Sequence, residues 1–166
     1  MRYKTPLFFL FAIALIGLAV NSCKKDTSGT IPTLFTQGKW QLASVLRTRT
    51  NGNITVIDTL NATCDSTQIF TFNTDNTCSY TNFDCIPQAK KGTWSLTPDQ
   101  LTLRAAITCS DTTSAHSSQP FSNAQVVTLG LYSMVLQTGD YDIIPTATNK
   151  TTVVRWGFVR QKTSIN

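Results

Sequence analysis

Residues 38–47 read GKWQLASVLR, and apolar and polar side chains alternate along this stretch with a period of two. In an extended chain, one face would carry the even-numbered residues from Trp40 to Leu46, and the other the odd-numbered residues from Gln41 to Arg47. The stretch therefore predicts a β-strand. Asn51-Gly52 follows it and predicts a hairpin turn, since a type I′ turn needs positive φ at both central residues.

Similar alternation, bounded by turn residues, recurs along the chain. It predicts further strands at 54–60, 68–73, 78–83, 92–96, 101–107, 125–129, 134–137 and 154–160. The composition agrees, because the chain has 28 threonines and no glutamate, so β-branched residues are abundant and good helix formers are scarce. Eight or nine short strands with regular turns favour an antiparallel sandwich or barrel. The segment 110–120 (SDTTSAHSSQP) is predicted to be a polar loop.

An ordered series of motifs chooses between these two architectures. Gly38-Lys39-Trp40 has the G-x-W form of a first lipocalin strand, and it is followed by Cys64-Asp65, by 69–76 (IFTFNTDN), by Cys85 and by 92–96 (GTWSL). Over roughly residues 37–161, this series resembles the lipocalin-like domain of bacterial envelope lipoproteins. The resemblance implies an all-β fold: an antiparallel up-and-down β-barrel of about eight strands, assigned here to residues 37–166.

The resemblance also implies how the barrel is closed at one end. In lipocalins, the tryptophan of the first strand closes that end and an arginine of the last strand packs over it. Trp40 matches the tryptophan, and either Arg160 or Arg155 matches the arginine. A guanidinium stacks well on an indole face, so the pairing is physically reasonable.

The N-terminus has the features of a leader. Arg2 and Lys4 precede an apolar run of 14 residues, Leu7 to Val20, which is too short to span a membrane as a helix. Cys23 follows directly, and this order resembles a bacterial lipobox. We therefore expect a signal peptide over 1–22 and lipidation of Cys23, for example with palmitate. The Gly-, Pro-, Ser- and Thr-containing segment 23–36 is expected to be a flexible tether.

The number of cysteines is consistent with this expectation. Five cysteines would leave one unpaired in an exported protein, but lipidation of Cys23 leaves four for disulfides: Cys64, Cys78, Cys85 and Cys109. The family-like spacing favours Cys64–Cys85, which leaves Cys78–Cys109. The rival pairing joins Cys78 to Cys85 and Cys64 to Cys109.

Aromatic side chains make the candidate ligand site. Alternation allows an inward position for Trp40, Phe70, Phe72, Tyr80, Trp94, Trp156 and Phe158. An eight-stranded barrel is wide enough either to be filled by its own side chains or to hold one small ligand. The sequence leaves open whether these rings fill the core or line a pocket for a small hydrophobic molecule.

The sequence contains little that suggests catalysis. His116 is the single histidine, and no G-x-S-x-G, H-E-x-x-H or G-x-x-x-x-G-K motif occurs. The cysteine spacings do not suit a metal site, and Asp140 and Asp142 are interpreted as turn residues rather than calcium ligands. We expect no enzymatic activity, no cofactor and no metal.

Charge and leader together predict location and partners. The formal charge of +5 falls to +3 when Arg2 and Lys4 leave with the signal peptide, which is too weak for a nucleic-acid partner. Lys24 after the cysteine favours the outer membrane, by resemblance to known sorting rules. We expect a monomer, anchored in the envelope through its lipid, that binds a small hydrophobic ligand. The alternative is a filled barrel that acts as an interaction or accessory module of an envelope complex.

Overall fold

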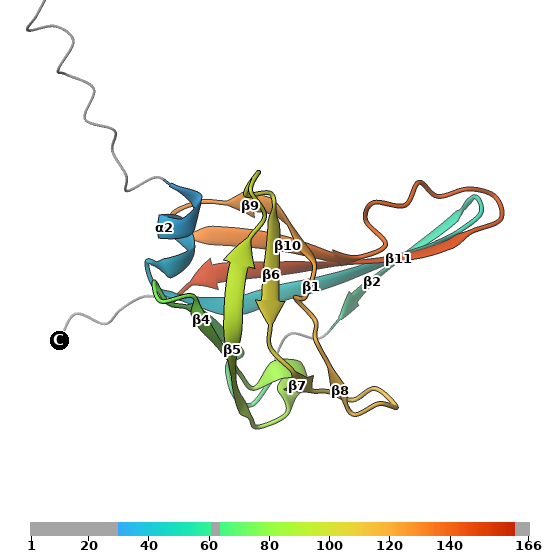
Figure 1. Cartoon of the computed structure of the whole chain (residues 1–166). Helices are drawn as coiled ribbons and strands as arrows, with labels where there is room; N and C mark the ends of the chain where they lie inside the picture. Colours follow the sequence, from blue (N-terminus) through green and yellow to red (C-terminus); the bar gives the residue numbers. More distant parts are fainter. Residues whose placement is uncertain (1–29, 61–63, 162–166) are drawn as a thin grey trace, which may run out of the picture.

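A computed structural model describes residues 30–60 and 64–161, shown in Figure 1. The predicted signal peptide and Cys23 lie outside the described residues. Eight antiparallel strands close into a barrel, since β11 pairs with both β10 and β1. Those strands are β1 (Lys39–Asn51), β3 (Ile69–Phe72), β4 (Thr77–Thr81), β5 (Ala89–Leu96), β6 (Thr102–Ala106), β9 (Ala124–Leu129), β10 (Ser133–Gly139) and β11 (Lys150–Arg160).

The prediction of an up-and-down antiparallel barrel is confirmed, and this barrel fits a lipocalin-like fold. Neighbouring strands follow one another in sequence around the barrel. Three short elements lie outside the barrel wall: a ribbon of β7 (Cys109–Ser110) and β8 (Ser117–Ser118), and the 3₁₀ turn η2 (Phe83–Cys85). The ninth strand of the large sheet, β2 (Ile54–Leu60), pairs only with β1.

A short helix stands where the end of the flexible tether was predicted. This helix, α2 (Ile31–Thr36), has a proline at its start, where the missing N–H costs nothing. Phe35 is fully buried, with its ring 5.0 Å from Phe72 and 5.6 Å from Trp94, centroid to centroid. The prediction of a tether reaching residue 36 was therefore wrong for 31–36, because burial of one aromatic ring orders a segment whose composition looks flexible.

A β-bulge in β1 changes which residues face the barrel interior. The pairing of β1 with β11 shifts register between Leu42 and Ser44. Trp40 and Leu42 are buried before the shift, and Val45 is buried after it, so the inward face changes from even to odd positions. The prediction that Ser44 and Leu46 share the face of Trp40 was wrong, because strict alternation holds only for a strand without a bulge.

The second half of β1 leaves the barrel wall. Beyond Val45 it pairs with β2 on one side and β11 on the other, and these three strands project away from α2 (Figure 1). We call this projection the arm: residues 45–60 together with 150–156. Its hairpin turns at Gly52 and Asn53, and only Gly52 has a positive φ, +59°. This is the pattern of a type II′ turn rather than the predicted type I′ turn.

Candidate functional site

The predicted ligand-lining rings lie in the barrel interior. Trp40, Phe70, Phe72 and Tyr80 are 0–1% exposed and Trp94 is 6% exposed, whereas Trp156 is half-buried. They pack with four more rings, those of Phe35, Phe83, Phe121 and Phe158. Phe158 had been placed in the predicted interior set, whereas Phe35, Phe83 and Phe121 come from α2, η2 and a turn, where strand alternation could not identify them.

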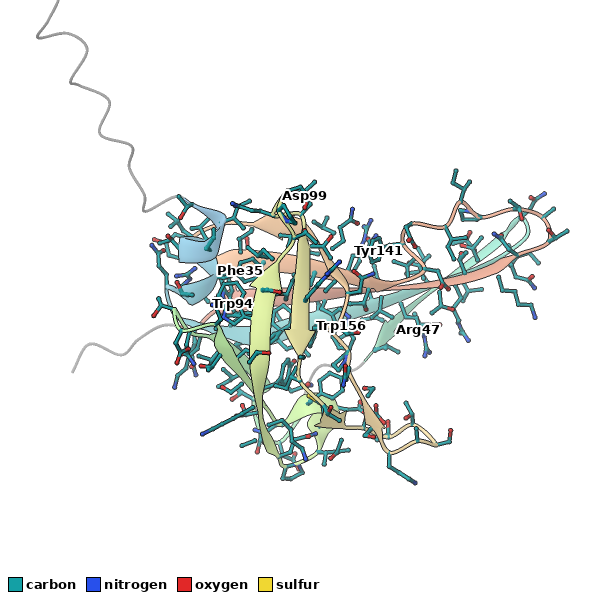
Figure 2. The ribbon with its side chains drawn as sticks, in the orientation of Figure 1. Phe35, Arg47, Trp94, Asp99, Tyr141 and Trp156 are labelled. Atoms are coloured by element: carbon teal, nitrogen blue, oxygen red, sulfur yellow. A yellow bond between two sulfur atoms is a disulfide. The ribbon has the colours of Figure 1, made fainter. Side chains whose placement is uncertain are left out.

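These rings contact each other rather than an open space. Phe70 is central, with its centroid 4.1 Å from Phe72, 5.1 Å from Tyr80 and 5.0 Å from Phe121. Phe121 also lies 5.3 Å from Trp156, so the chain of ring contacts continues from the α2 end toward the base of the arm. Figure 2 shows Phe35 and Trp94 at the α2 end and Trp156 nearer the arm. At the level of Phe70, the barrel interior is filled by the protein's own side chains.

One end of the barrel is closed by α2 and a stacked arginine. Arg160 Cζ lies 4.5 Å from the centroid of the Trp40 ring, and Arg160 Nη2 donates to the Leu34 carbonyl at 2.8 Å. Trp40 Nε1 donates to the Phe35 carbonyl at 2.9 Å. The structure thus places Arg160 over Trp40, whereas Arg155 Nε donates to Gln137 Oε1 at 2.7 Å. Desolvation lowers the pKa of the Arg160 guanidinium.

The predicted Cys64–Cys85 disulfide is confirmed, with a Cα–Cα distance of 5.3 Å. The predicted Cys78–Cys109 disulfide was wrong, because both cysteines are free and buried. Cys78 pairs with Gly92 of β5, and the Gln88 side chain bonds to the backbone of Ser110, next to Cys109.

The two thiols are expected to be unreactive in the folded protein. Desolvation raises the pKa of Cys78 and of Cys109 from 9.0 to about 11. Since the folded-state pKa is higher than the unfolded one, the neutral thiols contribute a constant stability below pH 9, and this contribution is lost as the pH rises through 11. We expect the urea midpoint to fall between pH 9 and 11, and a Cys78→Ala/Cys109→Ala variant to show a smaller fall. If a Cys64→Ser/Cys85→Ser variant also showed a smaller fall of the urea midpoint between pH 9 and 11, the fall would not come from the two free thiols.

One polar group in the barrel interior is left without a partner. The Tyr80 hydroxyl is buried and has no hydrogen-bond partner among the described residues. Desolvation raises the pKa of Tyr80, so the phenol stays neutral. In contrast, the three indoles of the interior set are satisfied: besides Trp40, Trp94 Nε1 donates to the Asn73 carbonyl at 3.0 Å, and Trp156 Nε1 donates to Thr138 Oγ1 at 2.9 Å.

The arm carries several exposed apolar side chains. Along β2, Ile54 is 67% exposed, Val56 44% and Ile57 61%. The loop 140–149 adds Ile143 and Ile144, which are 46% and 82% exposed. Side chains alternate along a strand, so Ile54 and Val56 share one face of β2 and Ile57 lies on the other. The arm therefore exposes apolar side chains on both of its faces.

Basic residues lie beside these apolar ones. Arg49 Nη2 donates to Asp58 Oδ2 at 2.7 Å, and Arg47 Nη2 lies 3.4 Å from the same oxygen, so one carboxylate serves two guanidiniums. Arg49 and Lys150 also line a groove of about 390 Å³ that has Ile54 and Val56 on its wall. Figure 2 shows Arg47 at the base of the arm. Sequence reasoning missed this surface because it considered the net charge and not which basic residues the fold brings together.

The other groups that were considered for chemistry lie apart. His116 is exposed in the tight β7–β8 connection, and Asp140 Oδ2 accepts the Thr152 N–H at 2.8 Å. Over 30–60 and 64–161, no cluster of three or more His, Cys, Asp or Glu side chains could hold a metal ion. In that same part of the chain, no helix is long and apolar enough to cross a membrane.

Fold and site together define a class of protein: a small, closed, up-and-down β-barrel with aromatic rings packed around Phe70 in its interior and a sheet that extends into an exposed arm. Residues 21–131, more than half of the chain, match the family described as a domain of unknown function (DUF5004), and the chain belongs to that family. A search of curated proteins found no match.

Proposed function

We propose that this protein is a lipid-anchored protein of the bacterial envelope, held in the outer membrane through Cys23, and that its filled barrel acts as a protein-interaction module. In this proposal the barrel is a rigid scaffold and the arm is the contact surface. The proposal includes no enzymatic step and no cofactor.

One contrast supports an interaction module over a carrier of small ligands. The rings that could have lined a pocket pack against each other around Phe70 at centroid distances of 4.1–6.3 Å, whereas Ile54 and Ile57 of β2 are more than half exposed. Burying exposed apolar surface is the main source of stability in protein association. The arm can gain this stabilisation, whereas the interior has already used its apolar surface in folding.

The arrangement of the arm also suits a tethered protein. The arm and α2 lie at opposite ends of the molecule (Figure 1). A lipid anchor that joins the domain through the segment before α2 would therefore hold the α2 end near the membrane and leave the arm accessible. Acyl chains contribute about 0.8 kcal/mol per buried CH₂, and two or three chains hold a protein stably.

Lipidation is tested by metabolic labelling. Cells that express the full chain and take up an alkyne fatty acid should yield a labelled protein. A Cys23→Ser variant should lose the label and leave the membrane fraction, because no other residue of the leader offers a thiol for acylation. A Cys78→Ser variant serves as the control and should keep its label. Equal labelling of the Cys23→Ser variant would exclude the proposed anchor.

The interaction surface is tested by site-specific photo-crosslinking in intact cells. A benzophenone amino acid at Ile57 should form an adduct of defined mass, because that side chain is 61% exposed on the arm. The same probe at Leu101, which is 55% exposed outside the arm, is the matched control and should form none. If neither Ile54 nor Ile57 gives an adduct, the arm is not the contact surface. A small apolar molecule that co-purifies in native mass spectra would favour ligand carriage instead.

A further inference from the structure

Among the described residues, β2 pairs only with β1, and its other edge is free. This free edge points to a specific partner for the arm, and this inference rests on the proposed function. We infer that two copies of this chain associate through their β2 strands, which pair antiparallel about a two-fold axis at Ile57. The paired strands would join the two arms into one continuous six-stranded sheet.

The hydrogen-bonding pattern of the hairpin leaves a defined set of groups free. Residues that face each other in an antiparallel pair alternate between hydrogen-bonded and non-hydrogen-bonded pairs. The pair that flanks the two-residue turn, Asn51 and Ile54, is hydrogen-bonded, so Val56, Asp58 and Leu60 also bond to β1. The residues between them are Thr55, Ile57 and Thr59. Their N–H and C=O groups therefore point away from β1, toward the free edge of β2.

The sequence of β2 is nearly symmetric about the centre of this edge. It reads Ile-Thr-Val-Ile-Asp-Thr-Leu over 54–60. An apolar residue stands at each end of the strand, and a threonine stands second from each end. Two antiparallel copies centred on Ile57 would align Ile57 with its equivalent and Thr55 with Thr59 of the second copy. Every free edge group then meets a complementary one, and the apolar ends Ile54 and Leu60 face each other.

Charge does not oppose this pairing. Asp58 is the single charged residue of β2, and in the pairing it lies opposite Val56 of the second copy rather than opposite another carboxylate. Its own chain already neutralises it, through Arg49 at 2.7 Å and Arg47 at 3.4 Å. Like charges directly opposite each other would destabilise a strand pair, and this register avoids them.

The edge of β2 also lacks several features that usually prevent an edge strand from pairing with another chain. Protected edge strands are typically short or carry a lysine, a proline or a bulge. β2 has seven residues without Lys or Pro, and its pairing with β1 has no shift in register. A regular apolar edge of this kind is a template for another strand.

The resulting dimer is compatible with one membrane. A two-fold axis that relates antiparallel neighbours within a sheet runs perpendicular to the sheet. Rotation about this axis leaves both barrels at the same height relative to the plane of the sheet. The barrels lie at opposite ends of the joined arms, because β2 and its equivalent run in opposite directions. Since α2 lies opposite the arm in each copy (Figure 1), the two α2 helices lie at the two far ends of the dimer, at the same height along the two-fold axis. Two lipid anchors can enter one bilayer when that axis stands perpendicular to the membrane and the joined arms lie parallel to it.

Native mass spectrometry of the full chain, released from detergent, tests this pairing. We expect the mass of two copies for the wild type and of one copy for Ile57→Lys, which places a charge at the centre of the edge. Ile144→Lys is the matched control, because Ile144 is 82% exposed in the loop 140–149 but does not lie on this edge. The control should remain a dimer. A second variant, Ile57→Pro, removes only an outward N–H and should also be monomeric.

Amide hydrogen exchange gives a readout that a nonspecific dimer would not produce. The amides of Thr55, Ile57 and Thr59 should become protected at least tenfold as the protein concentration rises through the dimerisation range. The amides of Val56 and Asp58, which bond to β1, should be protected at every concentration. A monomeric wild type, or a dimer in which the Thr55, Ile57 and Thr59 amides exchange fast, would overturn the inference.

The outcomes also separate this inference from the proposed function. If the purified chain is monomeric while a probe at Ile57 captures a different protein in cells, the arm is a contact surface and self-pairing is excluded. If the chain is monomeric and Ile57 captures nothing, both fail.

Discussion

Replacing Phe70 with alanine is expected to lower the free energy of unfolding by about 3–5 kcal/mol, which is the range for truncating a buried aromatic ring. Phe70 is fully buried and its ring contacts Phe72, Tyr80, Phe121 and Phe158. Removing it would leave a void in the centre of the interior, because the surrounding rings belong to separate strands and a turn and cannot all move inward.

The measurement is equilibrium unfolding in urea at fixed pH. The midpoint should fall while the slope of the free energy against urea stays the same, since the change affects stability rather than compactness. Tyr132→Ala is the aromatic control: its side chain is 78% exposed, and we expect a change within about 0.5 kcal/mol. A loss below about 1 kcal/mol for Phe70→Ala would mean that the interior is loosely packed, and a ligand-carrying barrel would then become the better interpretation.

Removing the Cys64–Cys85 disulfide is expected to cost about 3 kcal/mol, from the chain-entropy estimate for a sequence separation of 21. The bridge joins the break between β2 and β3 to η2. Side chains around it form a hydrogen-bond network: Gln68 Oε1 accepts the Asp84 N–H at 3.1 Å, and Asn82 Nδ2 donates to the Thr67 carbonyl at 3.0 Å. Without the bridge, these bonds must be formed between segments that are far apart in the unfolded chain.

Dithiothreitol titration distinguishes this bridge from the two free thiols. Reduction should lower the urea midpoint of the wild type and of a Cys78→Ser/Cys109→Ser variant by the same amount. A Cys64→Ser/Cys85→Ser variant should begin at the lower midpoint and not respond to reductant. If the Cys78→Ser/Cys109→Ser variant loses its response instead, the cysteines are paired differently in solution.

Local patterns predicted the fold well where each residue's position depends on its immediate neighbours. Alternation and turn residues identified the barrel strands, and the G-x-W motif located Trp40 at the end that α2 closes. The errors arose where one residue changes the pattern for the rest of a strand. The bulge after Leu42 exchanged the two faces of β1, and no residue type in 42–45 signals a bulge.

The candidate site was harder to predict than the fold. The inward aromatics were identified, but whether they line a pocket depends on rings from distant segments, such as Phe121 and Phe35. The disulfides show the same limit. Family-like spacing indicated Cys64–Cys85, whereas only the tertiary structure shows that Cys78 and Cys109 are free.

The sequence by itself determined the all-β class, because alternation and turn chemistry act over a few neighbouring residues, and the family resemblance implied the eight-stranded barrel. Only the tertiary structure decided that aromatic rings pack the interior around Phe70 and that β2 lies at the edge of the described sheet. Both are properties of how segments far apart in the chain share space. Phe35 fills one end of the interior because α2 folds back over it. Strands β2 and β3 pair with different parts of β1, so β2 ends the sheet of the described residues.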